Sequence, residues 1–483
     1  MRRARIALAA VLGAAAAALS LLITTAPGPG LDPDAMEYLG AAEALVHHGA
    51  FRVPAAAWHD PDSTSPLQHF PPGYSIVVAP GVAAGLSPVQ SARLVQALAA
   101  GAMLALAFWL VSGVAGLAGG SLAALVLVAT PAMASDHVRI LSEPLFLALL
   151  LGTVLLMLLL PERALACGLL AAAAGLVRYA GFSLSGAGAL VALWRGGPLW
   201  RGRARAAALV ALPGILLQGA WSLRTRLEGG SIRDIAHYGG VAETLDDGRR
   251  TLLTWLAPGV HSPMQMLVAS AVALLAIALV LRAARGALAF FGALGIAGAS
   301  FAALVLVSRL FADPDIPFDE RMLSPLMVLA SLAASAAVVL ALRGLPRAVR
   351  IASVVAVAAW VTASGAATLR FVHEAREGGW GYAMPGWQAS RVVRWLRAEG
   401  GSHTLFTNNA AGIWFFTHRP SRGLPESYDS SEVADFGETL RSGRGVIAAF
   451  KDGYGTEVSA DSVARLLRLR PLMHTAAGTV FGP

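Results

Sequence analysis

The chain has 483 residues, of which 56% are hydrophobic and 14% are charged, and its mean hydropathy is +0.63. This composition excludes an ordinary soluble protein of two or three domains, so most of the chain must lie in lipid. The formal net charge is +8, but the arginines fall in short gaps between apolar runs. They indicate membrane topology, and we expect no nucleic-acid partner. The single cysteine, Cys167, excludes disulfides and a cysteine-based metal site.

Eleven apolar segments have about the length needed to cross a bilayer. The first follows three arginines and has features of a signal peptide, but its length and the spans after it favour an uncleaved helix. Residues 73–86 are shorter and contain Pro80, so we expect a juxtamembrane or re-entrant segment. The predicted spans are residues 5–24, 90–112, 117–134, 144–160, 164–177, 180–194, 206–222, 263–281, 287–311, 322–341 and 348–369.

The arginine-rich gaps predict the orientation, because cytoplasmic loops carry an excess of Lys and Arg. If residues 73–86 do not span, the gaps fall on one side together with the N-terminus, and that side is the cytoplasm. Counting 73–86 as a span would place the same arginines outside. The arginines in question are Arg163, Arg195, Arg201, Arg203, Arg205, Arg282, Arg285, Arg343, Arg347 and Arg350. We therefore expect a multi-pass inner-membrane protein with a cytoplasmic N-terminus.

The remaining polar segments are then predicted to lie outside the cytoplasm. They are residues 25–89, 135–143, the junction at 178, residues 223–262, residues 312–321 and the tail from 370. The fold class is mainly α. Residues 1–370 form a bundle of about eleven spans with a first outer loop at 25–89, and residues 371–483 form a small extracytoplasmic α/β domain.

The tail shows alternating helix and strand patterns. An amphipathic helix GWQASRVVRWLRAEG follows Pro385, a strand HTLFTN ends in a turn at Asn408 and Asn409, and a strand RGVIAAF precedes the helix SADSVARLLRLR. We find no Gly-rich phosphate loop and no catalytic dyad in the tail.

The first outer loop carries the most informative pattern, LDPDAMEYLGAAEALVHHG. Asp32 is a suitable N-cap and Pro33 suits the first helical position, so Asp34, Glu37 and Tyr38 fall in the first turns of a helix. The spacing i, i+4 places Asp34 and Tyr38 on one face, and the helix N-terminus favours an ionised Asp34. These acids also suit a helix that is merely capped and solubilised by them.

Other charged and polar residues recur at the predicted outer ends of the spans. They are His69 in HFPPGYS, Arg139 and Glu143 in SDHVRILSEPLF, Arg178 in LVRYAG, and Glu320 and Arg321 in FDERMLSP. Each has a simpler explanation, such as a helix cap at Glu143 or snorkelling at Arg178. Together they supply carboxylates and guanidinium groups around one outer cavity, and ionisable residues at membrane depth are functional candidates.

The order and spacing of these segments resemble the polytopic glycosyltransferases of superfamily C (GT-C), in particular bacterial protein mannosyltransferases and lipid A aminoarabinose transferases. The resemblance covers roughly residues 1–370 and rests on DAMEYLGAAEAL, FPPGYS, SEPLF and DERMLSP. It places the family's essential first-loop aspartate on Asp34, and a second outer acid near Glu143 or Asp136. The chain departs from the family at Met322, where relatives often carry an aromatic residue, and in having its only lysine, Lys451, in the tail.

The resemblance implies a lipid-linked donor, that is, a sugar on the membrane lipid polyprenyl phosphate or diphosphate. A hydroxyl or amine of an acceptor in the cell envelope attacks this sugar at the outer face of the membrane. Asp34 would serve as base or charge stabiliser, with Glu143 as the second catalytic acid. Arg139, Arg178 and Arg321 are candidates for the departing phosphate, because a planar guanidinium binds two phosphate oxygens at once. Tyr38, His69 and Glu320 are the remaining candidates for substrate contact.

No cofactor is required by this chemistry, because the leaving group is already activated. A divalent cation is compatible with the acidic loop ADPDIPFDE, although solvated surface acids explain that loop as well. His47, His48 and His69 have no metal-ligand spacing, so we assign no metal site. Two other readings stay open: a transporter or flippase of lipid-linked or small polar substrates, and an assembly subunit that displays an outer domain.

Overall fold

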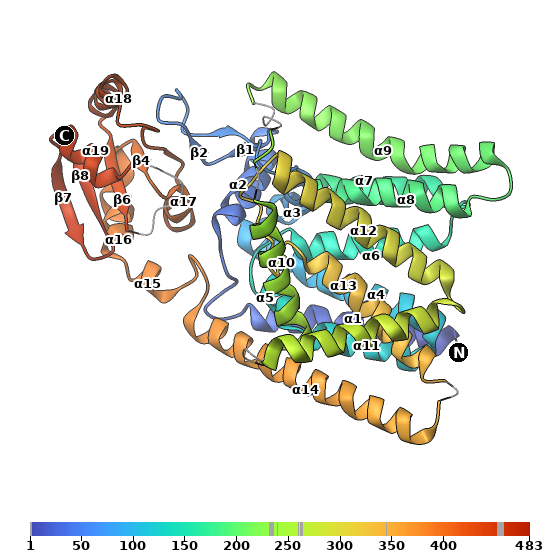
Figure 1. The fold of residues 1–483 in the computed structure, drawn as a ribbon. Coiled ribbons are helices and arrows are strands. Elements are labelled where there is room, and N and C mark those ends of the chain that lie inside the picture. The colour runs from blue at the N-terminus through green and yellow to red at the C-terminus, as the bar shows by residue number, and fades with distance from the viewer. Residues whose placement is uncertain are drawn as a thin grey trace. The chain divides into compact units, whose positions relative to one another are not determined.

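The computed structural model describes residues 2–230, 236–238, 240–258, 260, 264–343, 345–451 and 458–483. These residues form two compact units, each drawn from more than one stretch of the chain (Figure 1). Unit 1 comprises Met1–Ile23 and Arg93–Ala375, and unit 2 comprises Thr24–Ala92 and Arg376–Pro483. The first outer loop is therefore grouped with the tail, whereas the sequence-based division kept it with residues 1–370.

Unit 1 is a helix bundle that bears out the expected class of helical membrane protein. Within the described residues, seven helices are long and apolar enough to cross a membrane. They are α1 (Arg2–Ile23), α4 (Pro88–Ala129), α9 (Trp200–Leu227), α11 (Met264–Ala284), α12 (Leu288–Phe311), α13 (Ser324–Ala341) and α14 (Arg347–Gly378). The total of eleven spans stays a prediction.

Three further predicted spans coincide with shorter apolar helices of 14 to 16 residues: α6 (Glu143–Leu158), α7 (Ala164–Val177) and α8 (Phe182–Arg195). Helix α4 covers two predicted spans, and it is interrupted at Gly116, whose φ of 78° is a left-handed conformation that glycine adopts freely. Helix α3 (Gly73–Ala83) corresponds to the segment around Pro80 and has 11 residues. The other helical segments of unit 1 among the described residues are α5 (Pro131–Val138), the 3₁₀ turn η1 (Tyr179–Gly181) and α10 (Val241–Leu256).

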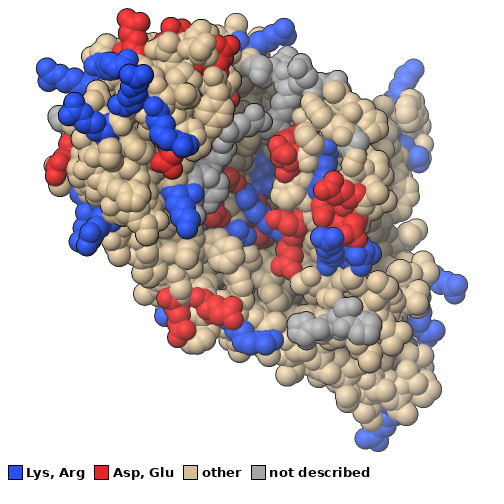
Figure 2. All heavy atoms as spheres, turned by 60° about the vertical axis from the view of Figure 1, so that its left-hand side comes forward, with Lys and Arg blue, Asp and Glu red and all other residues tan. Residues whose placement is uncertain are grey.

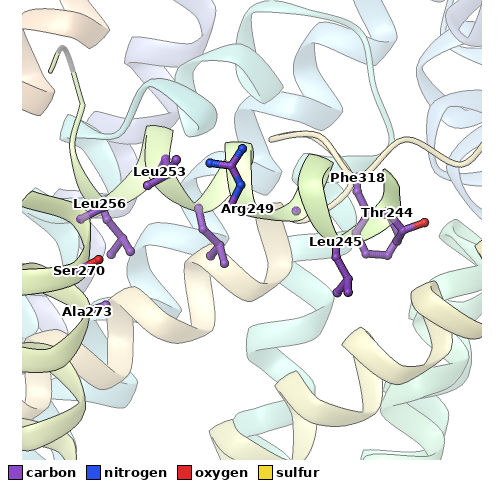
Figure 3. Close-up of a pocket in the computed structure, with 11 residues that line it drawn as sticks. Thr244, Leu245, Arg249, Leu253, Leu256, Ser270, Ala273 and Phe318 are labelled. Atoms are coloured by element: carbon purple, nitrogen blue, oxygen red, sulfur yellow. The ribbon is translucent and has the colours of Figure 1, made fainter. Parts of the chain in front are cut away.

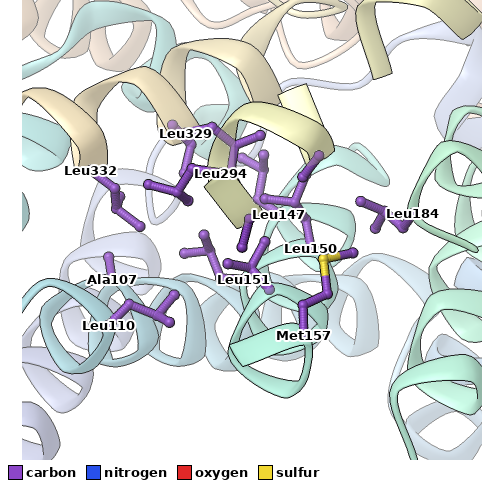
Figure 4. Packing of buried hydrophobic residues seen from close by; sticks show 14 of the residues in the cluster. Ala107, Leu110, Leu147, Leu150, Leu151, Met157, Leu184, Leu294, Leu329 and Leu332 are labelled. Carbon is purple, nitrogen blue, oxygen red and sulfur yellow. The ribbon is translucent and has the colours of Figure 1, made fainter. Parts of the chain in front are cut away.

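The core of unit 1 surrounds α6. Leu147, Leu150 and Leu151 of α6 are fully buried, and Figure 4 shows them among side chains from α4, α8, α12 and α13. A helix that is apolar on all sides must be covered on all sides, which explains why α6 takes the central position. The first residue of this central helix is Glu143, so a carboxylate begins the most buried element of the bundle.

Helices α1 and α4 approach each other closely through two glycines. A Cβ atom built on Gly13 would lie 2.9 Å from the carbonyl oxygen of Gly101, and one built on Gly101 would lie 2.8 Å from that of Gly13. Such reciprocal contacts allow helix backbones to pack tightly in lipid. At the end of the same helix pair, the Arg5 guanidinium donates to Ser112 Oγ (2.7 Å) and lies over the Trp109 ring (4.0 Å). Helix α1 is therefore packed as an integral part of unit 1.

We expect Gly101→Ala to lower the thermal stability of the protein in detergent. The new methyl group must displace a backbone carbonyl, and overpacking of this kind costs about 1–3 kcal/mol. The matched control is Gly295→Ala in α12, where a Cβ meets nothing within 4 Å, so the higher helix propensity of alanine is expected to leave stability equal or higher. A melting temperature of Gly101→Ala at or above that of the control would contradict the close packing of α1.

Unit 2 contains a six-stranded sheet whose order is β2-β5-β4-β6-β8-β7. The first four strands are parallel, β8 runs antiparallel to them, and β7 pairs antiparallel with β8 and so has the direction of the first four. The strands are β2 (Ala55–Ala56), β5 (Ser421–Arg422), β4 (Leu405–Thr407), β6 (Val446–Phe450), β8 (Gly478–Gly482) and β7 (Arg470–Thr475). Helices α16 (Arg391–Ala398) and α17 (Ala410–Thr417) cover one face, and α18 (Ser430–Ser442) and α19 (Ala460–Leu466) cover the other.

The first outer loop supplies strand β2 of this sheet. The Ser421 and Gly423 amides donate to the carbonyl oxygens of Pro54 (3.3 Å) and Ala56 (2.8 Å). The Trp58 indole donates to Glu432 (3.2 Å) and packs against Phe436 in the core beside α18. Helix α2 (Pro33–His48) precedes these residues in the chain. Strand β1 (Arg52–Val53) pairs antiparallel with β3 (Ser65–Pro66). The tail and the first outer loop are thus one folded body.

The structure modifies the elements expected in the tail. The expected helix from Gly386 is divided into α15 (Pro385–Gln388) and α16, and η2 (Gly400–Ser402) follows. The turn expected at Asn408 and Asn409 is wrong: Asn409 caps α17 by accepting from the Gly412 amide (2.9 Å), and Asn408 exchanges two hydrogen bonds with the Phe450 backbone. Strands β5, β7 and β8 and helices α17 and α18 were not expected.

Candidate functional site

A buried carboxylate, Glu143, joins two arginines that are distant in the sequence. Its Oε1 atom lies 2.5 Å from Nη1 of Arg178 and also accepts a hydrogen bond from Nε of Arg321. The Glu143 side chain is 2% exposed, and those of Arg178 and Arg321 are 12% and 22% exposed. A carboxylate at this depth requires paired cations, and here it has two.

Local structure explains why these three groups meet. Glu143 is the first residue of α6 and precedes Pro144, so the helix N-terminus adds favourable dipoles for its negative charge. Arg178 caps the C-terminus of α7, and Arg321 lies in the turn before α13. The Ser142 hydroxyl accepts from Arg178 (3.2 Å), whose other nitrogen lies 3.6 Å from Met322 Sδ. The Met322 departure from the family pattern thus places a thioether against the guanidinium.

Asp136 of α5 is a second acid in the same cluster and is fully buried. Burial raises the pKa of Asp136 well above its usual range, and the charge of Glu143 raises it further. The Ser324 hydroxyl and the Arg139 and Arg321 guanidinium groups oppose this shift only in part. Although Ser324 is near, neither carboxyl oxygen has a donor in good hydrogen-bond geometry among the described residues. Burial therefore favours the neutral form of Asp136.

Three guanidinium groups gather around the ion-paired carboxylate of Glu143. Those of Arg178 and Arg321 contact it directly, and Arg139 is close enough to Asp136 to lower its pKa. Arg139 also donates to the carbonyl oxygen (3.3 Å) and the hydroxyl (2.9 Å) of Ser135. Guanidinium groups gathered in this way are suited to bind an anion with several oxygens.

Of the other residues predicted in unit 1, Glu320 lies next to Arg321 in the chain, and among described residues it forms no hydrogen bond or ion pair. Burial, and secondarily the charge of Asp319, raises the pKa of Glu320. Among the described residues, no group of three or more His, Cys, Asp or Glu side chains is placed to hold a metal ion, the acidic loop included. The sequence reading missed His137, which is buried beside Asp136 and whose pKa burial lowers to about 4; the only sequence signal was its adjacency to Asp136.

Unit 2 carries the remaining predicted residues, Asp34, Tyr38 and His69. Helix α2 begins at Pro33 with Asp32 at the N-cap, as predicted, and Asp34 lies in its first turn, partly exposed. The Tyr38 ring is 1% exposed and packs against Phe70 (4.6 Å between centroids) and Tyr74 (5.1 Å). The His69 ring contacts Phe70 (4.4 Å). Through Tyr38, the rings of Phe70 and Tyr74 fix the first turns of α2, which carry Asp34.

Glu37 lies one turn after Asp34 on α2. Burial, with a contribution from the charge of Asp34, raises the pKa of Glu37 to about 8. A protonated carboxyl therefore lies beside the candidate base at neutral pH. The sequence placed Glu37 in this turn but gave no signal of its protonation state.

We expect the stability of the protein to fall as the pH rises from about 5 to 8, with Glu37 as one cause. The folded state holds a proton on Glu37 up to about pH 8, whereas an unfolded glutamate loses it near pH 4.3, so the folded state binds more protons in this window and loses stability as they dissociate. Glu37→Gln removes this contribution, and melting temperatures measured across the window should then slope less. The matched control is Glu43→Gln on the same helix; equal slopes for both variants would contradict the assignment.

No protein-family model and no curated protein sequence matches the chain. Solved structures do share its fold, among them the following three. The aminoarabinose transferase ArnT from Cupriavidus metallidurans, bound to undecaprenyl phosphate, is 14% identical with a TM-score of 0.60, and the alignment covers 99% of this chain and 97% of ArnT. The oligosaccharyltransferase of Archaeoglobus fulgidus tethered to an acceptor peptide is 12% identical, with a TM-score of 0.53 over 92% of this chain and 69% of that chain. A structure of the archaeal oligosaccharyltransferase AglB from Archaeoglobus fulgidus, in complex with an inhibitory peptide and dolichol phosphate, is 11% identical with a TM-score of 0.51. The alignment again covers 92% of this chain and 69% of that chain.

The fold is therefore that of membrane-embedded glycosyltransferases, as the sequence resemblance predicted. At these identities the likeness establishes the fold of the chain and leaves its chemistry to be argued from its own residues.

Proposed function

We propose that the protein is an integral-membrane glycosyltransferase that moves a sugar from a polyprenyl-phosphate-linked donor to an extracytoplasmic acceptor. The observation that carries the proposal is the gathering of the Arg139, Arg178 and Arg321 guanidinium groups around Glu143 and Asp136. A lipid-linked phosphate is an anion that such a group of guanidiniums can bind. Two of the solved structures with this fold contain undecaprenyl phosphate or dolichol phosphate, which supports the same class of donor.

Each charged residue receives a role in this proposal. Arg321, Arg178 and Arg139 bind the phosphate and stabilise the charge that develops on it as the sugar departs. Glu143 holds two of these guanidinium groups in place. Asp34 acts as base or charge stabiliser for the acceptor, which attacks the anomeric carbon while the bond to the phosphate oxygen breaks. Tyr38, His69 and Glu320 are assigned to the acceptor and sugar side on weaker grounds, since only their positions in the chain support that role.

An apolar cavity of about 530 Å³ in unit 1 is suited to the lipid tail of the donor. Its lining is contributed by α4, α10, α11, α12, α13 and α14, and it includes Trp255 and Trp360. Phe318 and Leu323, which flank Arg321 in the chain, also line it. The cavity therefore begins at the loop that carries a phosphate-binding candidate, which allows one lipid to place its phosphate at Arg321 and its tail between the helices.

Helix α10 borders this cavity and a second one. A smaller pocket of about 340 Å³ lies against α10 and α11, and Figure 3 shows Leu245 and Leu253 of α10, Ala273 of α11, and Phe318 around it. Phe318 and three residues of α10 line both cavities. Helix α10 is anchored by the Thr251 hydroxyl, which donates to the Phe318 carbonyl (2.7 Å), and by an ion pair between Asp247 and Arg309 (3.0 Å).

We propose an inner-membrane location with the N-terminus in the cytoplasm and the charged cluster and the tail outside. Contacts in unit 1 support a single arginine-rich end: Arg195 donates to the Leu158 carbonyl, Arg282 to that of Ala341 and Arg343 to that of Ala115. Figure 2 shows charged side chains gathered in some places on one face and stretches without them elsewhere on that face.

Filling the cavity tests the donor class. We expect Ala334→Phe, at the cavity wall, to weaken the use of a long-chain polyprenyl donor about tenfold, because two lost methylene contacts of about 0.8 kcal/mol each amount to that factor. A donor with a short ten-carbon chain should be used equally well by the variant and the native protein. The control is Leu274→Phe, at an exposed position of α11 outside the lining. Equal loss with both donors, or none with either, would contradict a tail site here.

A further inference from the structure

One end of the sheet in unit 2 gathers exposed arginines that the proposed reaction does not use. Arg444 precedes β6 by two residues, and Arg470 begins β7 opposite Gly482 of β8. The Arg441 guanidinium donates to the carbonyl oxygen of Leu467 (3.5 Å). Because Leu467 caps the C-terminus of α19 and precedes Arg468, this bond brings the ends of α18 and α19 together. All four arginine side chains belong to exposed residues.

This end of the sheet is rich in arginine. The segments that carry the four arginines, residues 439–446 and 467–472, contain no aspartate or glutamate. Among the described residues, none of the four arginines forms an ion pair with a carboxylate. Their guanidinium groups are therefore available to an external anion. Because β6 and β7 are separated by one strand, the arginines at their starts are about 10 Å apart, which suits several anionic groups along a chain better than a single one.

Two of these arginines occupy positions that favour glycine. Arg444 and Arg468 have φ values of 48° and 55°, in the left-handed region. Each directly follows the C-cap of a helix, and the bonds from Gly445 to the Leu440 carbonyl and from Leu469 to the Ala464 carbonyl complete the same C-terminal motif twice. Glycine adopts this conformation without strain, so an arginine here is maintained at a cost to stability. Such a cost indicates a function other than folding.

We propose that this basic end, formed by Arg441, Arg444, Arg468 and Arg470, binds a linear extracytoplasmic polymer with repeated phosphate groups. A planar guanidinium recognises phosphate through paired hydrogen bonds, and a row of them gives affinity that depends strongly on salt. This binding is separate from sugar transfer and does not require it.

A polymer with repeated phosphates fits the patch better than a single lipid headgroup does. The four arginines are distributed over the ends of two helices and the starts of two strands, whereas one headgroup offers one phosphate.

The test uses the full-length protein in nanodiscs of uncharged lipid, with long-chain inorganic polyphosphate as the probe. The double variant Arg444→Gly with Arg468→Gly is expected to bind polyphosphate at least tenfold more weakly at low salt, and its dependence of log affinity on log salt should fall by about 1.4, or roughly 0.7 per lost contact. Its melting temperature should be unchanged or higher, because glycine relieves the left-handed strain.

The matched control is the double variant Arg391→Gly with Arg394→Gly. These exposed arginines lie at the start of α16, away from the proposed patch. The preceding Trp387 packs on Phe450, which is at the other end of the sheet. Equal loss of binding in both variants would overturn the proposal, because net charge alone would explain it. A lower melting temperature of Arg444→Gly with Arg468→Gly without a specific loss of binding would show that the arginines only stabilise helix ends. Binding to anionic phosphatidylglycerol vesicles but not to polyphosphate would replace the polymer with a membrane surface.

Discussion

Glu143→Gln is expected to abolish sugar transfer and to destabilise the protein more than any other single substitution in the charged cluster. The variant keeps the shape of the side chain but leaves Arg178 and Arg321 as two buried cations without their shared carboxylate. Removing one partner of a buried ion pair costs about 3–5 kcal/mol, and the melting temperature of the purified variant measures this loss. Transfer fails because the guanidinium groups no longer hold a fixed geometry for the phosphate.

The double variant Glu143→Gln with Arg321→Gln separates stability from activity. The second substitution removes the Arg321 cation, which Glu143→Gln leaves without its carboxylate. The melting temperature should therefore recover toward the native value, while transfer stays lost. The control is Asp247→Asn, which breaks the more exposed pair with Arg309 and should cost about 1 kcal/mol or less. Native-like transfer by Glu143→Gln would show that the cluster is structural.

Asp34→Asn is expected to lower the rate of transfer by about 10²–10⁴-fold, the contribution typical of a positioned general base. The change is isosteric, and Asp34 is partly exposed in the first turn of α2, so the melting temperature should stay close to that of the native protein. Donor binding should also persist, because the proposed phosphate site is in unit 1. Rate constants under saturating donor, compared with Glu43→Gln on the same helix, check this expectation. A full rate with Asp34→Asn would move the role of base to another group.

The elements that the sequence predicted well are those with strong local signals. Long apolar runs gave the bundle helices, and the pair Asp32 and Pro33 located the start of α2. The orientation that the arginines in short gaps indicate stays a prediction. The resemblance to the GT-C fold was detectable because its ordered segments lie at helix ends, where a few polar residues stand out against apolar surroundings.

The features that the sequence could not supply depend on contacts between distant segments. Nothing near Glu143 in the chain identifies Arg321, 178 residues away, as its partner. Strand β2 has two residues and no period of its own, and it exists only because β5 pairs with it. Helix α10 was hidden in a polar outer segment, although its amphipathic pattern and the acids of its first turns were readable. The raised pKa values of Asp136 and Glu37 likewise follow from burial, which a sequence pattern does not reveal.

The most direct test of the account is transfer of a labelled sugar from polyprenyl-phosphate donors by the purified native protein in lipid bilayers, with released polyprenyl phosphate measured alongside. We expect the native protein to consume such a donor and release the lipid phosphate, and Glu143→Gln with Arg321→Gln to bind and consume none. Movement of the intact donor across the bilayer without cleavage of its sugar-phosphate bond would contradict the transferase and identify a flippase.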